Sequence, residues 1–163
     1  MVYIVSLLIV ILLSFLELSF LPYFSVLNIS IFIVLPFLVA SSVKSRDYFV
    51  IIIALVAGIM FDYASSGFIG QYILIFVLTV LVGRIFFNQK SSYRSSKPFL
   101  ILLLISTLTI YLTQIPILIN NNFVGWQNYL VYVIFGTSGT LIFGLILYRL
   151  LEPYFSWIEK NSE

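Results

Sequence analysis

The chain has 163 residues, of which 62% are hydrophobic and 9% are charged, with a formal net charge of +2. Its mean hydropathy is +1.17, whereas a soluble domain is nearer half apolar and a quarter charged, so the composition excludes an ordinary soluble domain. The absence of Cys and His excludes disulfides, thiolate and imidazole catalysis and the usual transition-metal ligands, and the small net charge is not typical of nucleic-acid binding.

Apolar runs near or above the length of about 20 residues that crosses a bilayer recur along the whole chain. We therefore predict an all-α integral membrane protein, a single polytopic domain over residues 1–163 with six transmembrane helices. The predicted spans are 2–21, 29–43, 48–64, 68–87, 99–119 and 129–151, followed by a cytoplasmic tail at 152–163. The second span is short and contains Pro36, so it must be kinked, thin the bilayer or lie partly inside the bundle.

The basic residues are distributed asymmetrically along this arrangement. With the N-terminus inside, the three outer links hold no basic residue. The inner segments hold all eight, which are Lys44, Arg46, Arg84, Lys90, Arg94, Lys97, Arg149 and Lys160. The positive-inside rule then predicts that both termini lie in the cytoplasm. The inner basic loop formed by Arg84, Lys90, Arg94 and Lys97 could bind anionic lipid, determine the topology or contact a cytoplasmic partner.

One polar stretch interrupts the apolar sequence, and the candidate site is built around it. Residues 58–70 carry Asp62, two serines and the glycines Gly58, Gly67 and Gly70. A carboxylate in or beside a membrane span is expensive, so Asp62 is a candidate functional residue, as is Glu17 in the first span. Both fall towards the outer ends of their helices, where this chain has no basic residue.

Two interpretations of these carboxylates remain open. Asp62 could accept backbone N–H groups of the turn at Ser65, Ser66 and Gly67 and so close a helical hairpin. Alternatively, Asp62 or Glu17 could also meet a side chain of a partner protein. The six carboxylates of the chain are scattered, and we expect no catalytic, cofactor or metal site.

Two further patterns lie in the last two spans. Gly136, Thr140 and Gly144 recur every four residues, and such a stripe lets another helix approach closely, either within the protein or from a partner's single helix. The hydroxyl and amide residues of 106–114 could line a ligand cavity. Such residues more often bond back to their own helix or join neighbouring helices, and we favour that interpretation.

The pattern Ala57-Gly58-Ile-Met-Phe-Asp62, followed by Gly67-Phe-Ile-Gly70, resembles the bacterial rod shape-determining protein MreD family. That family shows a Gly-Leu-x-x-Asp helix end, a short turn and a Leu-Gly that starts the next helix. Gly58 and Asp62 match the first part, and Ile69-Gly70 stands for the second. The chain departs from the family in Ser-Ser-Gly-Phe-Ile, where Pro-Leu is usual, and in Glu17, where Gln is frequent.

The resemblance covers nearly the whole chain by layout, and residues 57–70 by motif. It implies a non-enzymatic scaffold subunit of the cell-elongation machinery for peptidoglycan synthesis in the bacterial cytoplasmic membrane. The implied partners are a single-pass MreC-like protein, an MreB-like filament and cell-wall synthases. The family is similar in fold to the substrate-binding subunits of energy-coupling-factor vitamin transporters, so the alternative function is a small-molecule transporter subunit. A membrane enzyme ranks third, because it would depend on Glu17 and Asp62 alone.

Overall fold

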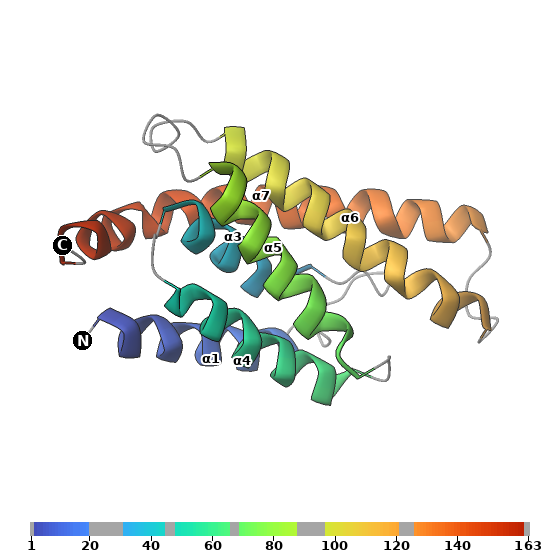
Figure 1. The fold of residues 1–163 in the computed structure, drawn as a ribbon. Coiled ribbons are helices and arrows are strands. Elements are labelled where there is room, and N and C mark those ends of the chain that lie inside the picture. The colour runs from blue at the N-terminus through green and yellow to red at the C-terminus, as the bar shows by residue number, and fades with distance from the viewer. Residues whose placement is uncertain are drawn as a thin grey trace.

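The computed structural model describes residues 2–19, 31–44, 48–65, 69–87, 97–120 and 126–161. Every regular element in these ranges is a helix, and there are six: α1 (Val2–Ser19), α3 (Val34–Lys44), α4 (Phe49–Ala64), α5 (Gln71–Phe87), α6 (Lys97–Asn120) and α7 (Trp126–Asn161). For this part of the chain, the prediction of an all-helical protein with six helices is confirmed. The first residue of α1 and the last residues of α7 lie at the same end of the bundle (Figure 1).

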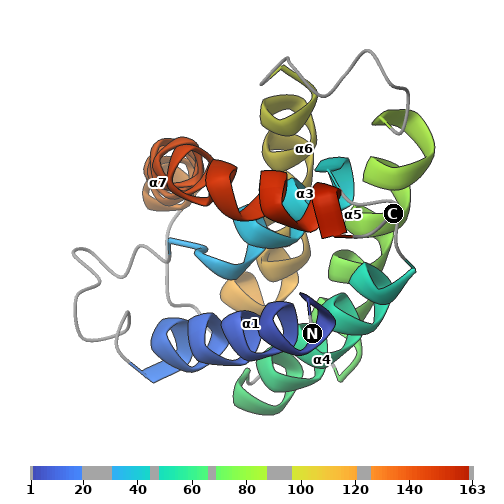
Figure 2. The same ribbon diagram turned by 90° about the vertical axis from the view of Figure 1, so that its left-hand side faces the viewer.

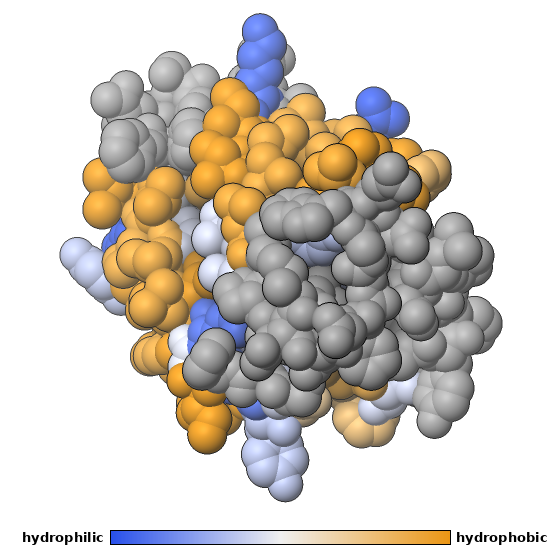
Figure 3. All heavy atoms as spheres, turned by 90° about the vertical axis from the view of Figure 1, so that its right-hand side faces the viewer, coloured by the Kyte–Doolittle hydropathy of each residue, from blue (hydrophilic) through white to orange (hydrophobic). Residues whose placement is uncertain are grey.

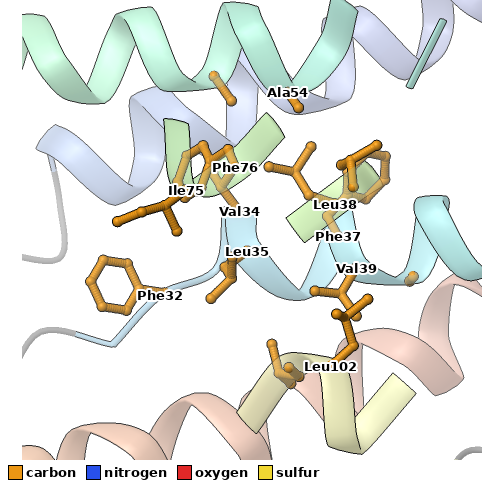
Figure 4. Packing of buried hydrophobic residues seen from close by; sticks show 14 of the residues in the cluster. Phe32, Val34, Leu35, Phe37, Leu38, Val39, Ala54, Ile75, Phe76 and Leu102 are labelled. Atoms are coloured by element: carbon orange, nitrogen blue, oxygen red, sulfur yellow. The ribbon is translucent and has the colours of Figure 1, made fainter. Parts of the chain in front are cut away.

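The short helix α3 lies at the centre of the bundle, and each of the other five helices contacts it (Figure 2). Its side chains are buried almost without exception, because neighbours surround it on every side. Leu38 faces α4 and α5, whereas Val39 faces Leu102 of α6 (Figure 4). An all-round apolar helix of this kind is expected only where no face meets water.

The outer helices bury one side and expose another that is also apolar. Exposed large hydrophobic side chains lie on α1, α4, α5, α6 and α7, for example Leu12, Ile59, Leu74, Leu112 and Ile142. Hydrophobic side chains accordingly cover the flanks of the described helices in the view towards the end where α5 and α7 begin (Figure 3). The interior holds the buried polar groups, which are Ser6, Ser14, Glu17, Ser41, Ser42, Asp62, Thr79, Ser106, Thr107 and Thr140.

One described helical stretch, Tyr129–Tyr154 of α7, is long and apolar enough to cross a membrane by length and composition. The other apolar helical stretches of the described residues are shorter, at 10–17 residues: Ile4–Ser19, Val34–Val43, Phe49–Ala64, Gln71–Ile85 and Phe99–Gln114. The number of helices therefore agrees with the prediction, while six complete spans remain a prediction.

Two helix boundaries differ from the predicted spans. The helix α3 begins at Val34 and not at the predicted residue 29, since residues 31–33 are not helical. Pro36 lies in its first turn, where a backbone N–H would have no partner within the helix, so the missing N–H of proline costs no hydrogen bond. The last helix continues to Asn161 and includes most of the predicted tail. Pro153 lies inside α7, where it removes one helical hydrogen bond without ending the helix.

Candidate functional site

Glu17 binds the N-terminus of the central helix. It lies in the last turn of α1, is 6% exposed, and its Oε2 accepts the N–H groups of Ile33 and Val34, both at 2.7 Å. The first N–H groups of a helix have no partner within it and carry a partial positive charge. Ile33, just before the helix, has no side-chain acceptor. The cap that the local sequence lacks is therefore supplied by α1.

Thr140 of α7 binds the same segment from the opposite side. Its Oγ1 accepts the N–H of Phe32 at 3.2 Å and donates to the carbonyl oxygen of Gly136 at 2.8 Å. The hydroxyl of Tyr111 is also hydrogen-bonded to Thr140. Three consecutive N–H groups, those of residues 32–34, are thus held by side chains of α1 and α7, which fixes where α3 begins.

Asp62 binds the N-terminus of α5 in the same manner. Its Oδ2 accepts the N–H groups of Gly70 at 3.0 Å and Ile73 at 3.3 Å, and its Oδ1 accepts the N–H of Tyr72 at 2.9 Å. The side chain is 7% exposed. Asp62 therefore does close the α4–α5 hairpin, but it does so through the start of the next helix.

These three N–H donors are not the ones that the sequence analysis expected for Asp62, which lay within the turn at residues 65–67. The N–H of Ser65 donates to the carbonyl oxygen of Phe61, so the prediction that it donates to the Asp62 carboxylate is wrong. The α4 helix ends at Ala64, and the Ser65 N–H is needed for its last backbone hydrogen bond. The other two predicted donors, Ser66 and Gly67, lie outside the described residues, as does the predicted site residue Gly67 itself.

The two described glycines of the motif explain its spacing. A Cβ at Gly58 would lie 2.5 Å from Cα and 2.8 Å from N of Ile73, so only glycine lets α4 approach the first turn of α5 this closely. Gly70 has φ of 95°, which favours glycine, and its carbonyl oxygen accepts the N–H of Leu74 to begin α5. Gly58, Asp62 and Gly70 therefore act together to build one helix junction.

Tyr72 connects Asp62 to α6. Its N–H donates to the Asp62 carboxylate, and its hydroxyl accepts a hydrogen bond from Nε2 of Gln114 at 3.0 Å. One residue earlier, Nε2 of Gln71 donates to Oγ1 of Thr113 at 2.7 Å. The start of α5 is thus joined to α6 by two adjacent side-chain hydrogen bonds.

The stripe of small residues on α7 faces the interior of this chain. A Cβ at Gly136 would collide with the hydroxyl of Tyr111, and one at Gly144 would lie 2.6 Å from Cδ2 of Leu103 and 3.3 Å from Pro36. Thr140, between them, is fully buried. These contacts are with α6 and α3, so the described face of the stripe is occupied by the protein itself.

The polar side chains of α6 bond within the bundle. The hydroxyls of Ser106, Thr107, Thr109 and Thr113 donate to backbone carbonyls three or four residues earlier. Together with the two bonds to α5, these contacts agree with the interpretation that this segment joins helices.

Gly83 of α5 is a close-packing position that the sequence analysis did not identify. A Cβ added there would collide with Leu102 and with the Ser42 hydroxyl. The signal available in the sequence was a glycine inside an apolar helix.

Of the predicted basic loop, Arg84 and Lys97 lie in the described residues, and Lys90 and Arg94 lie outside them. The guanidinium of Arg84 stacks on the ring of Tyr48, with Cζ 3.6 Å from the ring centroid. Lys97 is exposed at the first position of α6. The described residues contain no group of three or more His, Cys, Asp or Glu side chains that could hold a metal ion.

Comparison of this chain with protein-family models, with curated proteins and with solved structures gives no match. The chemistry of the candidate site must therefore be argued from its own geometry. Glu17 and Asp62 each accept backbone N–H groups at the start of a neighbouring helix. The first carboxylate joins α1 to the start of α3, and the second joins α4 to the start of α5.

Proposed function

We propose that this protein is a multi-pass scaffold subunit of the bacterial cell-elongation machinery, with no catalytic activity, that binds a single-pass MreC-like membrane protein. In this proposal, six segments lie in the cytoplasmic membrane and both termini face the cytoplasm. An MreB-like filament and cell-wall synthases are reached directly or through that partner. The membrane lipid is the surrounding solvent, and no nucleic acid or cofactor takes part.

The membrane arrangement is supported by where polar and apolar groups lie. Monomeric soluble proteins rarely expose large contiguous apolar patches, and here five helices expose apolar side chains while carboxylates and hydroxyls are buried. Lipid tails are a suitable environment for those faces. The end of the bundle that holds both termini also holds the last turn of α5, with Arg84, and the start of α6, with Lys97, as the positive-inside rule requires (Figure 1).

The observation that carries the scaffold proposal is the junction built by Gly58, Asp62 and Gly70. These are the described positions at which the chain resembles the MreD family, and each has a separate physical role in one helix junction. The resemblance in sequence thus corresponds to a defined local structure.

The alternative of a small-molecule transporter subunit needs several polar groups that converge on a cavity. The described candidates for that task, the hydroxyls and Gln114 of α6, already bond to their own backbone or to Tyr72 and Gln71. We therefore do not prefer it. The same experiment distinguishes the two functions.

The test is native mass spectrometry of the protein extracted with mild detergent from its own membranes. A stoichiometric single-pass protein with a large external domain supports the scaffold proposal. A bound metabolite, or an ATPase-containing module in place of that protein, contradicts it and favours the transporter subunit. An Asp62→Asn variant should reduce the yield of complex in proportion to its loss of folded protein, because the Asp62 carboxylate is fully engaged within the chain.

A further inference from the structure

On the side of the molecule formed by α4 and α5, the exposed apolar stretch along the helices is short, and polar or aromatic groups bound it at both ends. On α4, the exposed tyrosines Tyr48 and Tyr63 stand at the two ends, and the exposed Ile52, Leu55 and Ile59 lie between them. Tyr48 already has helical dihedral angles. At about 1.5 Å per residue, the two tyrosines are roughly 22 Å apart along the helix. Tyrosine favours the interface between hydrocarbon and water.

The neighbouring helix α5 gives the same length independently. At its start, the N–H of Gly70 is held by the Asp62 carboxylate; near its end, Arg84 stacks on Tyr48. From Gly70 to Arg84 the helix advances roughly 21 Å. A guanidinium is costly to place in hydrocarbon, so Arg84 marks one limit of the apolar layer. The start of the helix at Gly70 marks the other, because backbone outside a helix needs hydrogen-bond partners that lipid lacks.

The opposite side of the molecule is longer. On α7, exposed apolar side chains extend from Leu130 to Ile146, and the exposed Arg149 follows. From Leu130 to Arg149 the helix advances roughly 28 Å, which is close to the hydrocarbon thickness of a typical bilayer. The hairpin of α6 and α7 also reaches well beyond the junction of α4 and α5 at the end where α7 begins (Figure 1). Tilting α4 shortens its projection further, and tilting α7 alone would remove the difference only at about 40°, the upper limit for transmembrane helices.

We propose that the α4–α5 face holds a locally thinned annulus of phospholipid with shorter acyl chains, while the α7 face contacts lipid of ordinary length. A bilayer adapts to a short hydrophobic span by thinning, and lipids of shorter chain lower the cost of doing so. The matching chain has about 14 carbons, since 22 Å is about three quarters of the ~30 Å core formed by 18-carbon chains. This inference rests on the proposed membrane arrangement and not on the identity of the partner.

The first experiment measures immersion depth on both faces. Because the chain has no Cys, single cysteines can carry spin labels without a background. Ile69→Cys and Ile85→Cys bracket the α5 side, and Leu130→Cys and Leu150→Cys bracket α7; all four positions are more than half exposed. Each labelled full-length protein is reconstituted in bilayers of dioleoyl phosphatidylcholine, and its accessibility to oxygen and to a water-soluble nickel chelate is compared.

The proposal expects both α5 labels at headgroup depth in the same bilayers in which the α7 labels bracket a core of full thickness. It is overturned if either α5 label lies several ångströms inside the hydrocarbon, because the bilayer beside α5 would then be unthinned. If all four labels are freely accessible to the chelate, the proposed membrane arrangement fails as well, so the two failures are distinguishable.

A second measurement tests the lipid preference directly and does not depend on the labels. In a Trp126→Phe, Trp157→Phe background, Ile59→Trp reports on α4 and Ile142→Trp is its matched control on α7; the native side chains are 56% and 62% exposed. Quenching by brominated phosphatidylcholines gives relative lipid-binding constants. We expect about a twofold or larger preference for 14-carbon over 18-carbon chains at Ile59→Trp and none at Ile142→Trp. The same preference at both positions contradicts the proposal.

Discussion

Removal of the Asp62 carboxylate tests the central structural argument. The carboxylate accepts three N–H groups at the start of α5, at 2.9 to 3.3 Å, and only 7% of the residue is exposed. A hydrogen bond to a charged group contributes about 1.5–3 kcal/mol, and the longest of the three is weaker. Allowing for partial replacement by water at Gly70, we expect Asp62→Ala to lower the free energy of unfolding by about 3–5 kcal/mol.

Asp62→Asn should retain about half of this stabilisation, because its single carbonyl oxygen accepts N–H groups without the charge. The measurement is reversible unfolding by SDS in mixed micelles, followed by circular dichroism. Glu152→Ala, at an exposed carboxylate of α7, is the control and should change the stability by less than about 0.5 kcal/mol. If Asp62→Ala loses less than about 1 kcal/mol, the capping argument is refuted.

Three further changes test neighbouring features. Glu17→Ala should cost about 2–4 kcal/mol and speed hydrogen exchange of the N–H groups of residues 33 and 34, whereas unchanged exchange there would exclude the cap on α3. Gly58→Ala should lower the free energy of unfolding by about 1–3 kcal/mol, because the new methyl meets the backbone of Ile73. Gly139→Ala is its control, since a Cβ there approaches only a side chain, at 3.3 Å. Equal losses of stability at the two sites would contradict this reasoning. Tyr48→Leu should cost about 0.5–1 kcal/mol through loss of the Arg84 stack, measured by the same unfolding assay, and no change would mean that the stack is not stabilising.

Most residues of the candidate site could be predicted from the sequence, although the N–H groups that donate to its carboxylates could not. The polar stretch at 58–70 and the buried carboxylate Glu17 stand out because ionisable residues are rare in apolar sequence. A sequence of one chain does not say which N–H groups a carboxylate meets, since the donors for Glu17 lie at the start of another helix, 16 and 17 residues away. The partners of Thr140 and Gln114 are similarly distant, at 108 and 42 residues.

By itself, the sequence determined the helical class and the approximate positions of the helices, because these depend on local composition and on the run of apolar residues. Only the tertiary structure decided that α3, the shortest of the described helices, is the central one, since apolar residues that stay exposed and apolar residues that face other helices look alike in sequence. The difference in length between the exposed apolar stretches of α4 and α7 also acquires meaning only when the two helices lie on different sides of α3 in one bundle. The sequence thus determined what each segment is, and packing determined which groups face one another.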